Sequence, residues 1–159
     1  MLFRSPQKKF KILDLGSNDG ILSLPLLKQF NDNIDSVIMY DSSTDVLDHI
    51  NKTYGKRYPK IKTVNDDVRN VLNYDFQPDI VLIGELLEHV EETTQFLEFL
   101  MKLANKDTIF YFTVPMGPWE NMIRRRDDEI HHVHHFELND LSTIFQNVDR
   151  KSTRLNSSH

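Results

Sequence analysis

Five short and nearly continuous apolar runs alternate with segments of helical periodicity, and this alternation constrains the fold of the chain more than any other feature. The runs are KILDL (11–15), SVIMY (36–40), IKTV (61–64), DIVLI (79–83) and TIFYFTV (108–114). Strands that are apolar on both sides are typical of parallel sheets covered by helices. We therefore predict an α/β fold with a doubly wound, mainly parallel sheet and helices on both faces.

The segments between these runs predict the helices and the extent of the domain. Apolar residues at helical spacing predict helices over 21–30, 44–54 and 92–104, and a last short helix over 138–145. We expect a single domain over residues 1–150. The remainder, KSTRLNSSH (151–159), is polar and aperiodic and resembles translated cloning sequence, so we predict a non-native tail there and a sheet truncated before its last strands.

Composition excludes several classes of function. The chain has no cysteine, which excludes disulfides, thiolate zinc sites and cysteine nucleophiles. No apolar run approaches the roughly 20 residues that cross a membrane, and no secretory signal precedes the first strand, so we expect a cytoplasmic protein without a membrane partner. The net charge of -5 argues against a dedicated nucleic-acid binder.

The loop after the first predicted strand, Gly16-Ser17-Asn18-Asp19-Gly20, is the natural ligand loop of such a sheet. A dinucleotide places its pyrophosphate at the following helix, which favours three glycines and no neighbouring acid. Here Asn18 stands at the middle glycine position and Asp19 follows it, so the carboxylate would repel a pyrophosphate. With Asp14 at the strand end, the loop is chemically better suited to a cation.

Four further motifs follow in order. VIMYD places Asp41 at the end of the second strand, 25 residues after Gly16, and NDDVRN follows the third strand. DIVLIGELLEHV and then TIFYFTVP, with GPWE and HHVHHFELNDL after it, complete the set. Together with ILDLGSNDG, these motifs make residues 10–146 resemble the class I S-adenosylmethionine-dependent methyltransferases, in particular their small-molecule branch. The resemblance implies a Rossmann-like fold.

The same resemblance implies the donor and its binding residues. S-adenosyl-L-methionine would be the cofactor, transferring its methyl group by in-line displacement to a small-molecule acceptor. Asp41 would hold the ribose hydroxyls, Asp67 would accept from the adenine amino group, and Glu85 would lie near the methionine end. The full predicted cofactor-binding set is Asp14, Gly16, Ser17, Asn18, Gly20, Asp41, Ser42, Asp67, Val68 and Glu85.

Carboxylates and imidazoles gather in two later segments. Glu85, Glu88 and His89 share one face of a helical turn, and a histidine cluster follows at 131–135. Because imidazole titrates near neutral pH, we predict His89 and one of His134 or His135 as general-base candidates. The predicted catalytic set is His89, Glu88, His134 and His135.

Three alternatives to this function are open. Glu85, Glu88, His89 and His134 resemble the metal site of the small-RNA 3′-terminal 2′-O-methyltransferases, and two carboxylates with two imidazoles would favour Mg²⁺ or Mn²⁺. RNA is then the acceptor. Alternatively, the chain is a catalytically inactive cofactor-binding module. A dinucleotide-dependent oxidoreductase is the third alternative, which Asp19 disfavours. The sequence does not predict the oligomeric state.

Overall fold

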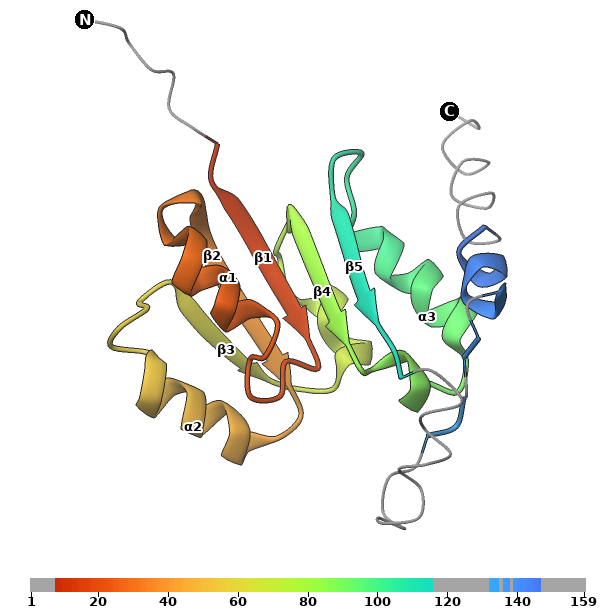
Figure 1. Ribbon diagram of the computed structural model, residues 1–159, viewed down its shortest axis with the longest axis horizontal. Helices are drawn as coiled ribbons and strands as arrows, with labels where there is room; N and C mark the ends of the chain where they lie inside the picture. Colours follow the sequence, from red (N-terminus) through yellow and green to blue (C-terminus); the bar gives the residue numbers. More distant parts are fainter. Residues whose placement is uncertain (1–7, 116–131, 135, 138, 147–159) are drawn as a thin grey trace, which may run out of the picture. The chain divides into compact units, whose positions relative to one another are not determined.

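The computed structural model describes residues 8–115, 132–134, 136–137 and 139–146, and its framework is a five-stranded sheet. Figure 1 shows the strands side by side. The strands are β1 (Phe10–Leu15), β2 (Ile34–Asp41), β3 (Ile61–Asn65), β4 (Ile80–Gly84) and β5 (Ile109–Thr113). Their order in the sheet is β3-β2-β1-β4-β5, and β1 pairs in parallel with both β2 and β4. The predicted Rossmann-like, parallel α/β fold is confirmed.

The helices follow the predicted periodicity closely. They are α1 (Ser23–Phe30), α2 (Thr44–Tyr54) and α3 (Thr93–Leu100), with a further helix over 139–146. Short 3₁₀ turns are η1 (Asn31–Asn33), η2 (Val68–Asn73), η3 (Leu87–His89) and η4 (Met101–Leu103). The helix expected over 92–104 therefore ends earlier, and its last turn tightens into η4, as the C-terminal turns of helices often do.

The chain divides into two compact units. The first comprises residues 1–84 and 104–112, and the second comprises residues 85–103 and 113–159. In the first unit, α1 and α2 pack on the strands around a buried cluster that includes Leu27, Val37 and Ile50. Four successive residues of β1, Ile12 to Leu15, are buried, because both faces of this central strand are covered.

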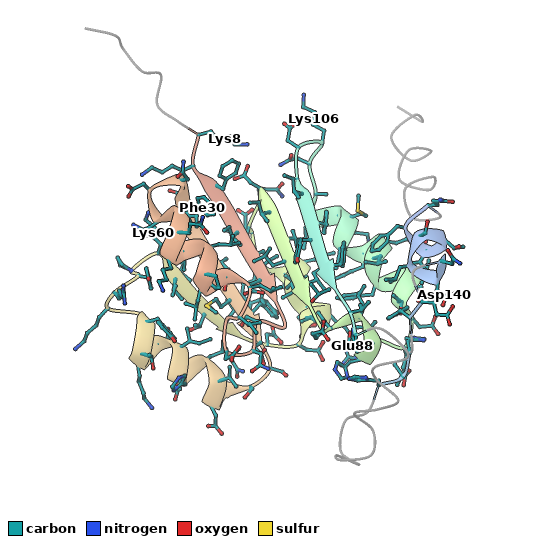
Figure 2. The ribbon with its side chains drawn as sticks, viewed as in Figure 1. Lys8, Phe30, Lys60, Glu88, Lys106 and Asp140 are labelled. Atoms are coloured by element: carbon teal, nitrogen blue, oxygen red, sulfur yellow. The ribbon has the colours of Figure 1, made fainter. Side chains whose placement is uncertain are left out.

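Polar contacts stabilise the first unit at the amino ends of its strands. Lys60 donates from Nζ to the Ile34 carbonyl at 2.8 Å, holding the start of β2 to the turn before β3 (Figure 2). Asp79 accepts from the Lys11 N–H at 2.9 Å and pairs with the Lys8 ammonium. Within the described residues, no helix is long and apolar enough to cross a membrane. The predicted tail, 151–159, lies outside them.

Candidate functional site

The loop between β1 and α1 has an unusual backbone. Gly16, Asn18 and Gly20 have φ values of 64°, 43° and 79°, all in the left-handed region. Glycine adopts this region freely and asparagine tolerates it better than most residues, which explains why Asn18 can stand where glycine is commonest in this type of loop. At Gly20 a Cβ atom would lie 2.5 Å from Cε of Met39, so the loop also needs glycine for space.

The end of β2 holds this loop in place. The N–H groups of Gly16 and Ser17 both donate to the Tyr40 carbonyl, at 2.9 and 3.1 Å. The Asn18 N–H donates to Oδ2 of Asp41 at 2.8 Å. Because these three donors are already bonded within the protein, the loop does not offer them to a phosphate, which agrees with the preference for a cation expected from Asp19.

Asp14 is a buried acid at the end of β1. Asp14 is 1% exposed, and within the described part of the chain neither its Oδ2 nor the buried Ser17 hydroxyl has a hydrogen-bond partner. Burial raises the pKa of Asp14 to about 7; the nearby Ser23 opposes this rise, and the Asp41 carboxylate adds to it. Unsatisfied buried oxygens are costly, so this end of β1 is prepared for a cationic or hydrogen-bond-donating ligand.

Asp41, at the end of β2, uses both carboxylate oxygens inside the protein. Oδ2 accepts from Asn18, as above, and Oδ1 accepts from the Ser43 N–H at 2.8 Å, just before α2 begins. Asp41 therefore fastens two ligand-side loops at once. Each oxygen keeps a second lone pair, so the predicted bonds to ribose hydroxyls are compatible with these contacts, and that role stays a prediction.

After β3, two adjacent acids have different partners. Asp67 accepts from both the backbone N–H and the guanidinium of Arg69, and these bonds lower the pKa of Asp67 to about 2. Asp66 accepts from Asn70 at 2.8 Å and from the Tyr74 hydroxyl at 3.3 Å. The predicted adenine contact of Asp67 thus competes with Arg69, a partner that motif spacing did not indicate.

The remaining predicted cofactor-binding residues are placed as follows. Ser42 is exposed directly after β2, and Val68 is half-buried at the start of η2. Glu85, which belongs to the second unit, is exposed with φ 49°, and its N–H donates to the Thr113 carbonyl at 3.0 Å. A positive φ at a non-glycine residue costs about 1–3 kcal/mol and is commonest at functional sites.

The second unit contains a buried carboxylate beside two imidazoles. Glu88 lies on η3 (Figure 2). It is 1% exposed, and ligand atoms of Glu88, His89 and His132 all lie within 4.8 Å of one another. The His89 and His132 rings meet edge to face, with centroids 4.8 Å apart. Burial raises the pKa of Glu88, and Glu85 adds to the rise while the two imidazoles oppose it.

His134 lies outside this trio. Its Nε2 is 2.7 Å from the Glu91 carbonyl oxygen, and its ring packs on Phe136. The structure therefore brings together Glu88 and His89 of the predicted metal set, but it groups them with His132 in place of Glu85 and His134. Sequence spacing cannot tell neighbouring histidines of one cluster apart. His135 lies outside the described residues.

The sheet, with loops at the carboxyl ends of β1, β2 and β3, defines a Rossmann-like α/β domain, and a family model specifies it further. A model described as a methyltransferase domain matches residues 2–151. The chain belongs to this methyltransferase domain family, and the resemblance to class I methyltransferases noted in the motifs is confirmed. No curated protein sequence matches the chain.

Solved structures with the same fold are distant in sequence. The YcgJ protein from Bacillus subtilis matches with a TM-score of 0.69 at 14% identity, over 89% of this chain and 62% of its own. The plantazolicin methyltransferase BpumL, in complex with SAH, matches with a TM-score of 0.72 at 17% identity, over 89% and 56%. Protein BH2331 from Bacillus halodurans C-125 matches with a TM-score of 0.69 at 15% identity, over 91% and 64%. The chain thus spans less than two thirds of the length of each.

Proposed function

We propose that residues 1–150 form the S-adenosylmethionine-binding domain of a methyltransferase that acts on a small-molecule acceptor. The observation that carries this proposal is the buried Asp14 carboxylate, whose Oδ2 has no partner, at the loop after β1. A carboxylate in that place suits the ammonium of an amino-acid moiety and opposes a diphosphate. Bound S-adenosylmethionine supplies a methyl group on positively charged sulfur, and its transfer leaves a neutral thioether.

The chain's own residues would bind and orient the donor. Asp14 would pair with its ammonium, Asp41 would accept from the ribose hydroxyls, and Ser17 would use its unsatisfied hydroxyl. Gly16 and Gly20 would allow close approach of the backbone. Positioning of this kind is the main requirement when the leaving group is already activated, and well-aligned reactants gain about 7–11 kcal/mol.

Adenine binding is assigned to the loop after β3. Val68 would border the ring, and Asp67 would accept from the amino group through a lone pair not used by Arg69. Removal of the Arg69 side chain should then leave adenine recognition intact or strengthen it. Ser42, Asn18 and Glu85 complete the proposed set.

Acceptor chemistry is assigned to the second unit. His89 is exposed on η3 and follows the buried Glu88, and this exposure supports a role for its imidazole at the acceptor. A hydroxyl acceptor must lose a proton, and imidazole is suited to take it near neutral pH. The small-molecule assignment is supported by BamL, a plantazolicin methyltransferase of the same fold solved with a desmethylPZN analog and SAH.

Calorimetry with S-adenosylmethionine, S-adenosylhomocysteine and NAD tests the donor, and transfer of a labelled methyl group to a small-molecule library tests the reaction. The proposal expects both adenosyl compounds to bind and NAD not to bind. Binding of NAD alone would contradict it. If the cofactor binds and methyl groups are transferred to RNA ends but to no small molecule, the acceptor is RNA and not a small molecule. If the cofactor binds and no transfer occurs, the result favours a catalytically inactive cofactor-binding module.

A further inference from the structure

Glu88 is an anomaly that methyl donor binding does not explain. Glu88 is 1% exposed on a turn of three residues, and neither of its carboxylate oxygens has a hydrogen-bond partner among the residues that the structure describes. A buried carboxylate without compensation is strongly destabilising, and proteins normally pair such a group or use it to coordinate a metal. The question is which positive group these two oxygens are arranged to meet.

The backbone brings a histidine segment to this carboxylate. The Glu88 carbonyl accepts from the N–H of Val133 at 2.8 Å and from the N–H of His134 at 3.2 Å. These two bonds join segments more than 40 residues apart in the chain, and they place the half-buried His132 beside Glu88. His89 is brought to the same place because it is the next residue on η3.

From this juxtaposition we propose that Glu88, His89 and His132 form a binding site for a divalent transition-metal ion of the zinc type. Two imidazole nitrogens and one carboxylate are a donor set that zinc and its neighbours in the first row accept, with further positions left for water or an oxygen ligand. Mg²⁺ and Ca²⁺ prefer sets made of oxygens.

The distances allow the site to close on an ion by rotation of side chains. The three ligand atoms lie within 4.8 Å of one another. Bond lengths of about 2.0–2.1 Å to zinc would bring ligand atoms to about 3.3 Å apart in a tetrahedral site. Binding of the ion therefore requires the three ligand atoms to move closer together. His134 is held away by the Glu91 carbonyl.

Titration of the chelator-treated, full-length protein with Zn²⁺ tests the proposal directly, with Co²⁺ absorption as the report on coordination. One equivalent of Zn²⁺ should bind, and Co²⁺ should give d–d bands. His132→Ala and Glu88→Gln should each weaken Zn²⁺ binding by more than about tenfold. His134→Ala is the matched control from the same segment, and it should change the affinity less than about threefold, as should Glu85→Gln.

Several outcomes would overturn the site. They are the absence of stoichiometric Zn²⁺ binding, an affinity unchanged in His132→Ala, or loss of binding in His134→Ala. Saturable binding of Mg²⁺ in place of Zn²⁺ would overturn the site in favour of the set predicted from the sequence, which has two carboxylates: Glu85, Glu88, His89 and His134. If Glu88→Gln fails to fold, as judged by circular dichroism, His132→Ala alone decides. Binding of S-adenosylhomocysteine, measured on the same samples, separates failure of this site from failure of the proposed function.

Discussion

Replacement of Asp41 by alanine should weaken both the fold and the cofactor site, and its effect can be worked from two hydrogen bonds. The variant removes the acceptors of the Asn18 and Ser43 N–H groups, each bonded at 2.8 Å. Hydrogen bonds to charged groups contribute about 1.5–3 kcal/mol each. Because Asp41 is only half-buried, water replaces part of each bond, so we expect a loss of about 2 kcal/mol in the free energy of unfolding.

Urea unfolding followed by circular dichroism measures this loss. With a slope of about 2 kcal/mol per molar urea, the midpoint should fall by about 1 M. Asp41→Asn should lose about half as much, since an amide retains one acceptor oxygen. Asp48→Ala is the matched control, because Asp48 is an exposed acid on α2, and its effect should lie within about 0.5 kcal/mol.

Calorimetry with S-adenosylhomocysteine measures the second effect. The loss of ribose contacts and of the anchor for Asn18 should weaken binding by about 1.5–3 kcal/mol, or about 10- to 150-fold. An unchanged unfolding midpoint would refute the view that Asp41 fastens the two loops. An unchanged affinity in a folded variant would refute its place in the cofactor site.

Three further changes test other parts of the structure. Gly20→Ala should destabilise the protein by about 2–4 kcal/mol in thermal or urea unfolding, because of the φ of 79° and the clash with Met39. Asn18→Gly should be neutral or stabilising in the same assay. Equal effects of the two variants would contradict the loop geometry. The pKa of Asp14 is raised from 3.8 to about 7, so between these pH values the folded state holds a proton that the unfolded chain releases. The free energy of unfolding should therefore fall by up to about 1.4 kcal/mol per pH unit as the pH rises from 4 to 7. An Asp14→Asn variant with the same slope would disprove this. His89→Ala should reduce methyl transfer and leave S-adenosylhomocysteine affinity nearly unchanged, and parallel loss of both would assign His89 a structural role.

Local pattern was sufficient for the strands and for the first two helices. The apolar runs predicted all five strands, and helical spacing located α1 and α2 within two residues, because both signals depend on which neighbours along the chain share a face. The left-handed φ values of Gly16, Asn18 and Gly20, by contrast, were found only in the structure. The helix predicted over 44–54 ends at Gly55, which is in the right-handed region and where a Cβ would lie 2.6 Å from the Asn51 carbonyl oxygen.

Tertiary structure alone decided how the polar side chains are used. The local sequence does not show that Asp41 accepts a hydrogen bond from the Asn18 N–H, 23 residues away. It also does not show that His132 lies beside Glu88 while His134 contacts the Glu91 carbonyl. These partners come from segments that meet only when the sheet assembles and the backbone hydrogen bonds of Val133 and His134 form. Periodicity reports which side of an element a residue occupies, whereas a partner depends on distances between elements, and those are properties of the folded chain.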